Sequence, residues 1–274
     1  MPIWKPSLAV SPTRRAYTFI LKALGDVRLA DIDQDTVTRL RRAILRPNSG
    51  PSTVTRNLIT PLRAVLRHAH RRGWCDAPLL DTPRSPHGRT LLMVPAETEQ
   101  LLASAGPHLR PLIIFLLGTG ARLSEALYLD WRDVDLTGAR AIFWKTKNGK
   151  RRNAILPTRV VVALANLPHR DGAVFLRPDG QPYDDRDGYG GQVKTAWKGA
   201  IRRSGLNPEF TPHTCRHTWA SWHYALHRDL LRLKQEGGWS SVMLVERYAH
   251  LLPAGHERAI REFLGLTMSK MEAA

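Results

Sequence analysis

Residues 211–226 read TPHTCRHTWASWHYAL, and this stretch predicts a helix. Thr211 suits the N-cap and Pro212 the first helical position, so the helix starts here and continues to the end of the stretch. His213 and Arg216 are separated by about one turn and therefore face the same side. The stretch thus brings an imidazole and a guanidinium together on one helix face.

Two cofactor sites are excluded by residues in and near this helix. His213 and His217 have the i, i+4 spacing of two zinc ligands, but Thr214 stands where a metalloprotease carries Glu. Residues 118–122, GTGAR, resemble a phosphate loop but lack its Gly-Lys-Ser/Thr ending and follow a helix rather than a strand. We therefore expect neither a metal nor a nucleotide cofactor.

Helical patterns continue on both sides of this stretch. Gly118-Thr119-Gly120 ends an apolar helix and turns the chain before Ser124 begins the next, and Gly237-Gly238 ends another helix further on. The helices predicted in this half of the chain cover residues 95–105, 109–117, 125–129, 211–226, 228–236 and 255–264.

A β-hairpin is predicted between the helical segments. Residues 139–146 and 151–156 are β-like runs that flank Asn148-Gly149, the strongest short-range hairpin signal. Lys147 therefore sits at the hairpin tip. The side chains around it make the tip strongly basic, and they are Lys145, Lys150, Arg151 and Arg152.

The N-terminal segment is helical and basic. Helices are predicted for residues 35–45, entered through Asp33, and for residues 52–72, where Pro61 should kink the helix. Residues 39–74 contain no acidic side chain, which favours phosphate contact over a merely solvated surface. The candidate DNA contacts on the second helix are Arg56, Arg63, Arg67 and Arg71.

The composition points to a polyanionic partner. The 274 residues include 41 Lys plus Arg against 24 Asp plus Glu, a net charge of +17. Nucleic acid is the leading partner and a membrane surface the weaker one. The longest uncharged stretch, residues 111–121, is too short to span a bilayer. The chain also does not open with a signal-peptide pattern, so we expect a cytoplasmic protein. Cys75 and Cys215 fit neither a disulfide framework nor a zinc module.

Five motifs in order give the chain a family resemblance. TGARLSEAL, TKNGK, HTCRHTWAS, GGWSS and ERYAHL lie within residues 89–252, and together they resemble the tyrosine recombinases of the phage integrase family. The stretch ALGDVRLADI more loosely resembles the helical core-binding domain of that family. The resemblance implies a mainly α (α+β) fold with a core-type DNA-binding domain in residues 1–84, a linker in 85–90, and a catalytic domain in 91–274 with a small antiparallel sheet and a C-terminal tail helix.

The resemblance also assigns roles to single residues. Tyr248 in ERYAHL would be the nucleophile that forms a 3′-phosphotyrosyl bond. Arg122 and Arg216 would stabilise the pentacovalent phosphorane, with Glu125 holding Arg122 in register, because planar guanidiniums stay charged and grip two phosphate oxygens. The remaining roles are protonation of the leaving 5′-oxygen by Lys147, a phosphate hydrogen bond and proton handling by His213, and one indole hydrogen bond from Trp239.

The partners that the resemblance implies are double-stranded recombination sites. Four protomers would act on two duplexes, free protomers would be monomers, and accessory DNA-bending or directionality proteins would assist in a bacterial or phage nucleoid. The basic first domain and the catalytic domain would grip the duplex, with Lys150 and Arg151 joining the DNA contacts. His217 and His250 are assigned structural hydrogen bonds and Cys215 is assigned to packing.

Three alternatives remain open. A type IB topoisomerase would share the chemistry but rejoin the same strand as a monomer. A catalytically impaired DNA-binding relic is suggested by the roughly 20 residues before ALGDVRLADI, where relatives carry further helices. A plain basic DNA-binding regulator is the third, and the complete set of candidate catalytic residues argues against it.

Overall fold

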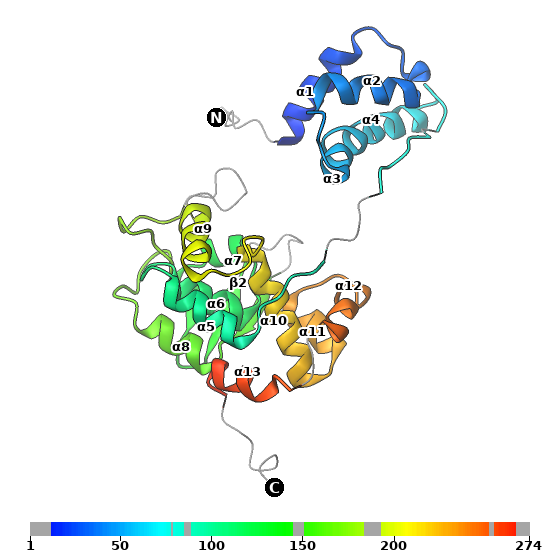
Figure 1. Cartoon of the computed structure of the whole chain (residues 1–274). Coiled ribbons are helices and arrows are strands. Elements are labelled where there is room, and N and C mark those ends of the chain that lie inside the picture. Colours follow the sequence, from blue (N-terminus) through cyan, green and yellow to red (C-terminus); the bar gives the residue numbers. More distant parts are fainter. Residues whose placement is uncertain are drawn as a thin grey trace, which may run out of the picture. The chain divides into compact units, whose positions relative to one another are not determined.

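The computed structural model describes residues 12–77, 79–84, 89–144, 151–183, 193–251 and 255–266. It divides into two compact units, Met1–Arg89 and Thr90–Ala274, which are described separately below (Figure 1). Among the described residues, none of the helices is both long and apolar enough to cross a membrane.

The N-terminal unit is a small helical bundle. Its core includes Leu40, Leu58, Leu62 and Leu66, all at most 2% exposed. The prediction that Asp33 begins a helix is confirmed, since its carboxylate accepts a hydrogen bond from the Thr36 backbone at 2.8 Å. Helix α1 was not predicted; its Ile20 is buried in this core, while Phe19 and Leu21 are exposed. The elements are α1 (Pro12–Leu24), η1 (Leu29–Asp31), α2 (Gln34–Ile44), α3 (Pro51–Val54), η2 (Thr55–Ile59) and α4 (Thr60–Arg71).

Pro61 changes the helical geometry just before it. The five residues Thr55–Ile59 form a π-helical turn between α3 and α4, and the Thr60 N–H bonds to the Thr55 carbonyl. Proline has no N–H to donate and its ring crowds the preceding turn, so the widened turn lets the helix continue through it. The predicted helix over residues 52–72 is thus present, with a π-turn where a kink was expected.

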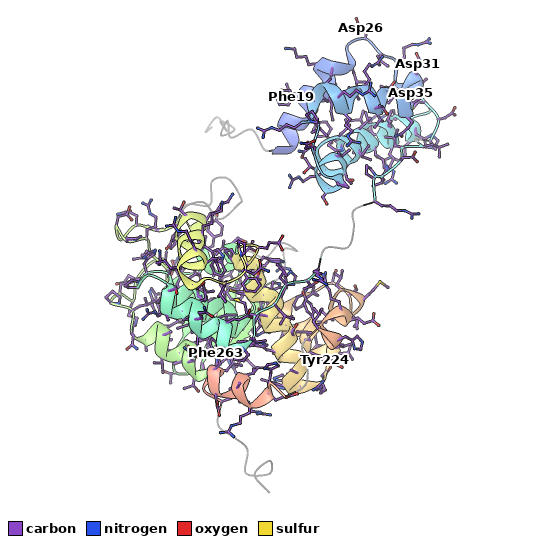
Figure 2. The ribbon with its side chains drawn as sticks, in the orientation of Figure 1. Phe19, Asp26, Asp31, Asp35, Tyr224 and Phe263 are labelled. Carbon is purple, nitrogen blue, oxygen red and sulfur yellow. The ribbon has the colours of Figure 1, made fainter. Side chains whose placement is uncertain are left out.

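Acidic side chains of this unit gather near the connection from α1 to α2. Asp26, Asp31 and Asp35 lie at that end of the unit (Figure 2), with Arg28 and Arg39 beside them. The helices from Pro51 to Arg71 carry basic side chains and no acidic ones. The basic residues of these helices therefore have no acidic neighbour on the same helices.

The C-terminal unit is built around helix α6. Its residues from Leu112 to Thr119 are all buried, and the helix packs against α5, α8 and α10 (Figure 1). Phe263 of α13 closes the same core against Trp222 of α10, with ring centroids 5.1 Å apart (Figure 2). The helices are α5 (Pro95–Ser104), α6 (Arg110–Thr119), α7 (Leu123–Leu127), η3 (Trp131–Asp133), α8 (Thr158–Ala165), α9 (Val193–Ser204), α10 (Pro212–His227), α11 (Leu230–Gly237), α12 (Met243–Glu246), η4 (Arg247–His250) and α13 (Glu257–Leu264).

A small antiparallel sheet accompanies these helices. Strands β1 (Val134–Asp135), β2 (Arg140–Phe143) and β3 (Arg152–Ile155) pair in that order, with Phe143 opposite Arg152. The two strands predicted to flank the hairpin are therefore confirmed, although both are shorter than expected. The predicted tip, with Lys147 and Lys150, lies outside the described residues.

Candidate active site

Arg122 and Glu125 are held together by the start of helix α7. Arg122 is the N-cap, and Glu125 lies three residues later in the capping-box position. The Glu125 carboxylate accepts the Arg122 backbone N–H at 2.9 Å and also the Arg122 guanidinium. One carboxylate therefore fixes both the main chain and the side chain of Arg122.

Arg216 on α10 is held by two backbone carbonyls that are far apart in the sequence. Its two terminal nitrogens donate to the carbonyls of Gly120, at 2.5 Å, and Gly237, at 2.6 Å. The side chain is almost completely buried, and its guanidinium carbon lies 4.1 Å from the Trp239 ring centroid. These contacts orient the guanidinium through neutral acceptors, so its positive charge stays available to an anion.

Both carbonyls belong to glycines that a larger residue could not replace. Gly120 has φ +60°, and a Cβ there would lie 2.1 Å from the Trp219 ring. A Cβ on Gly237 would lie 1.8 Å from the Trp239 ring. The glycine motifs therefore let the backbone come close enough to anchor Arg216.

Arg152 forms a third guanidinium contact in this region. It donates to the Glu125 carboxylate at 2.9 Å and to the Glu236 carbonyl at 2.6 Å, and its side chain is 6% exposed. The prediction that Arg152 adds to an exposed basic hairpin tip is wrong. Its position on β3 is opposite Phe143, and the inward-facing side of the strand carries it into the interior.

The Tyr248 hydroxyl lies against a histidine of α10. Tyr248 is on η4, and its oxygen is 2.7 Å from Nδ1 of His217, within hydrogen-bonding distance. His213 lies one turn before His217, and the two imidazole centroids are 4.7 Å apart. His213 is exposed and His217 half-buried, so the imidazoles lead from the surface to the tyrosine oxygen.

Trp239 links Arg216 to Tyr248 through ring contacts. Its ring stacks on Trp219 with centroids 6.1 Å apart and lies 5.7 Å from the Tyr248 ring. Trp219 and Tyr248 form, with Leu233 and Val245, a buried cluster separate from the main core, and Trp239 packs against it while staying partly exposed. Trp239 therefore serves packing in this structure as well as bordering Arg216.

The surroundings of Arg216, His213 and Glu125 lower the pKa values of all three groups. Burial, followed by the charges of Arg122 and Arg152, lowers the pKa of Arg216 to about 9. Partial desolvation of the ring, followed by the charges of Arg216 and Arg122, lowers the pKa of His213, although the residue keeps exposed surface. Burial by itself would raise the pKa of Glu125. The positive charge of Arg152, together with the hydrogen bond and charge of Arg122, has the larger effect and lowers that pKa below its ordinary value. The site therefore has an excess of positive charge, and a bound anion would stabilise the charged forms of Arg216 and His213.

Tyr248 keeps its proton in this environment. Burial raises the pKa of its phenol, and the nearby charges of Arg247 and Arg216 only partly offset that effect. Its hydroxyl therefore needs a proton acceptor before it can attack as a nucleophile. Within the described residues, no group of three or more His, Cys, Asp or Glu side chains is arranged to hold a metal ion.

The residues predicted from the sequence divide into three groups. The described part of the C-terminal unit brings together Arg122, Glu125, His213, Arg216, Trp239 and Tyr248. Lys147 and Lys150 lie outside the described residues, while Arg151 is exposed with its guanidinium 5.9 Å from the Trp144 ring centroid. Arg56, Arg67 and Arg71 are exposed in the other unit.

Arg63 differs from the other three basic residues of its helix. Its guanidinium donates to the Leu80 carbonyl at 2.6 Å and to the Thr82 hydroxyl at 2.8 Å. It therefore ties the segment after α4 to the helix, an interaction that no sequence pattern indicated.

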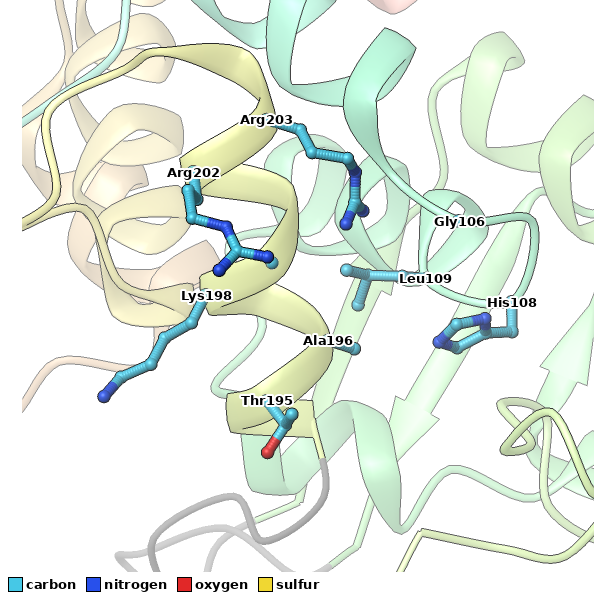
Figure 3. Close-up of a pocket in the computed structure, with 9 residues that line it drawn as sticks. Gly106, His108, Leu109, Thr195, Ala196, Lys198, Arg202 and Arg203 are labelled. Atoms are coloured by element: carbon cyan, nitrogen blue, oxygen red, sulfur yellow. The ribbon is translucent and has the colours of Figure 1, made fainter.

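A cationic stripe on α9 was also missed. Lys194, Lys198 and Arg202 are spaced i, i+4, i+8 and exposed, so they follow one face of the helix. Lys194 and Lys198 border a cavity of about 290 Å³ that includes His213, and Lys198 and Arg202 border another of about 550 Å³ next to His108 (Figure 3). The i, i+4 spacing was the available signal for this helix face.

Comparison with known proteins agrees with this geometry. The model of the phage integrase family matches residues 92–254. The integrase of Salmonella phage P22 is 28% identical over 247 residues, which is 83% of this chain but only 62% of that integrase. The tyrosine recombinase XerC of Methylobacterium sp. (strain 4-46) is 27% identical over 232 residues, 74% of this chain and 71% of the relative.

Solved structures share the fold. The Tn1549 transposon integrase in complex with transposon right end DNA has a TM-score of 0.69 at 19% identity, covering 92% of both chains. The lambda integrase (75–356) dimer bound to a COC′ core site has a TM-score of 0.68 at 16% identity, covering 86% of both chains.

The family match, the recombinase relatives and the mainly helical unit with its three-stranded sheet place the chain in the class of the tyrosine recombinases. The chain belongs to the phage integrase family.

Proposed function

We propose that this chain is a site-specific DNA recombinase that cuts and rejoins DNA through Tyr248. The tyrosine oxygen attacks the scissile phosphate, forms a 3′-phosphotyrosyl bond and releases a 5′-hydroxyl. A 5′-hydroxyl from a partner duplex reverses the step. One observation carries the proposal: the Tyr248 hydroxyl lies within hydrogen-bonding distance of His217, and His217 is on the same helix as Arg216.

Charge matching supports this chemistry. The phosphorane gains negative charge, and Arg122 and Arg216 are preorganised by Glu125 and by the two glycine carbonyls. Neutralisation by the chain's own guanidiniums is why we expect cleavage to persist in excess EDTA. Loss of cleavage in EDTA that magnesium restores would contradict this mechanism.

The leaving 5′-oxygen needs a proton, and we assign its donation to Lys147. The hairpin strands that flank it pair as predicted, which supports a tip that reaches DNA. A 5′-bridging phosphorothioate leaves without protonation, so Lys147→Ala should be severely slowed on normal DNA and close to wild type on that substrate. Equal impairment on both substrates would remove Lys147 from this role.

Double-stranded DNA is the proposed partner of both units. Contacts would come from the exposed basic residues of the N-terminal unit, from Arg151 and Lys150, and from the cationic stripe on α9. The Tn1549 and lambda integrase structures contain DNA, which supports a duplex substrate. We further propose a tetramer of this chain on two duplexes during strand exchange, with accessory DNA-bending proteins.

A suicide substrate tests the proposed function. DNA from the regions that flank the coding sequence, nicked beside each candidate site, should trap wild-type protein as a covalent adduct on a denaturing gel. Tyr248→Phe should bind the same DNA and form no adduct. An adduct with the phenylalanine variant would contradict the assignment, and relaxation of unpaired sites without exchange would favour a type IB topoisomerase.

A further inference from the structure

We propose that His217, rather than His213, accepts the proton of the Tyr248 hydroxyl when the tyrosine attacks the scissile phosphate. This inference rests on the proposed function and adds a catalytic residue to it. The observation that carries it is geometric, since Nδ1 of His217 lies 2.7 Å from the Tyr248 oxygen. A general base must be within such hydrogen-bonding reach of the proton that it removes.

Burial determines which atom donates in this hydrogen bond. The Tyr248 side chain is 2% exposed, so its hydroxyl hydrogen needs an acceptor inside the protein. A neutral imidazole has one acceptor nitrogen, and Nδ1 is the ring nitrogen beside the hydroxyl. The Tyr248 O–H therefore donates to His217 Nδ1, and the proton of the imidazole resides on Nε2.

Burial and the nearby positive charges keep His217 neutral, the form that can accept a proton. Burial, followed by His213, Arg247 and Arg216, lowers its pKa to about 4. The groups that face it are His213 and Arg216 on its own helix and Arg247 and Tyr248 on η4. A bound phosphate offsets the cationic charges, raises the pKa of the imidazole and makes it a better acceptor at the moment when it is needed.

The two histidines of α10 then have separate tasks. His213 is exposed at the outer end of the pair and is free to meet a phosphate oxygen, whereas His217 lies beneath it against the phenol. In the cleavage step the Tyr248 oxygen forms a bond to phosphorus and its proton moves to His217 Nδ1. The bond from phosphorus to the 5′-oxygen breaks, and Lys147 protonates that oxygen. Rejoining returns both protons.

The variant that isolates this role is His217→Asn. The Asn amide oxygen can take the place of Nδ1 as a hydrogen-bond acceptor, but it cannot take up a proton. The matched control is His250→Asn, because His250 is exposed and lies two residues from Tyr248. DNA binding by gel shift checks that both variants fold.

Single-turnover adduct formation on the nicked suicide DNA gives the decisive result. We expect His217→Asn to be slowed about 10² to 10⁴-fold at pH 7, the usual contribution of one general base, and His250→Asn to match wild type. The wild-type rate should fall as pH drops through the pKa of His217 in the complex and level off above it. The His217→Asn rate should instead keep rising with pH, because ionisation of Tyr248 then depends on solvent hydroxide.

Two chemical changes separate the base from the acid. Fluorotyrosine at position 248 loses its proton more readily and should narrow the gap between His217→Asn and wild type. The 5′-bridging phosphorothioate should leave that gap unchanged while it rescues Lys147→Ala. A His217→Asn variant with wild-type rate and pH profile would overturn the inference, whereas failure of wild type itself to form an adduct would overturn the proposed function.

A measurement on the intact side chain guards against misfolding of the variant. Nitrogen-15 NMR of histidine-labelled wild type bound to uncleavable DNA should find Nδ1 of His217 unprotonated at pH 7. A hydrogen on Nδ1 would mean that His217 donates to the tyrosine oxygen, and the inference would be wrong.

Discussion

Arg216 shows how a single residue can be both buried and charged. Its terminal nitrogens each use one N–H on a glycine carbonyl, and its planar fork leaves further N–H groups to meet a phosphate. Arg216→Lys keeps a charge but has no fork and cannot reach both carbonyls. We expect single-turnover cleavage at saturating DNA to fall about 10² to 10³-fold, the usual effect of losing one preorganised donor. Equal rates for the lysine variant and wild type would contradict this.

Arg152 forms a buried ion pair with Glu125 and helps to stabilise its carboxylate. Arg152→Met removes the guanidinium and leaves the Glu125 carboxylate, 1% exposed, with Arg122 as its remaining charged partner. Breaking a buried pair from one side typically costs about 3 to 5 kcal/mol, so the urea midpoint should fall markedly.

Cleavage by this variant should also slow, because Arg122 loses the fixed position of its carboxylate. The control is Arg258→Met, which breaks the exposed pair with Glu262 on α13. Exposed pairs contribute little, so its urea midpoint should stay near wild type. Similar midpoints for the two variants would show that Arg152 is not a structural support.

At the scale of elements, the end of α6 positions the Arg216 guanidinium. Gly120→Ala places a Cβ at φ +60° and 2.1 Å from the Trp219 ring, so either the ring or the Gly120 carbonyl must move. Gly172→Ala is a matched control, since Gly172 has φ +66° with nothing within 4 Å.

The control should lose only the roughly 1 to 2 kcal/mol of a left-handed alanine. Gly120→Ala should lose more stability in urea and should also cleave more slowly, because its carbonyl anchors Arg216. Equal losses for the two variants would show that the close approach to Trp219 is easily relieved.

At the scale of the whole molecule, both units should contribute to the salt dependence of DNA binding. Removing one cation that binds a phosphate should flatten the slope of log K against log salt by about 0.9. We expect this for alanine variants of the exposed cations, which are Arg56, Arg67 and Arg71 in one unit and Lys194, Lys198 and Arg202 in the other.

Arg63→Ala provides the contrast on the same helix as Arg67. It should lower the free energy of unfolding, because it removes two hydrogen bonds of about 0.5 to 1.5 kcal/mol each. Its salt slope should stay near that of wild type. A flattened slope without loss of stability would instead make Arg63 a phosphate-binding residue.

The sequence by itself determined most of the local structure and the class of the protein. Helix signals at Asp33, Pro95 and Thr211 and the strands beside Asn148-Gly149 depend on neighbouring residues, and the structure contains each helix and both strands. The ordered motifs identified the family for the same reason, since each is a short run of adjacent residues. Helices α1, α8, α9 and α12 were not predicted, and α12 has only four residues, too few for a helical pattern to be recognised.

Only the tertiary structure decided which side chains meet. Arg152 looked like one more exposed cation of the hairpin, yet it pairs with Glu125, 27 residues away. His217 was assigned a structural hydrogen bond, and the structure identifies its partner as Tyr248, 31 residues away, while Arg216 reaches Gly120 across 96 residues. Local propensity depends on adjacent residues, whereas these contacts arise only when β3 and η4 come together with α10 in the folded unit. The resulting burial orients the side chains and shifts their pKa values.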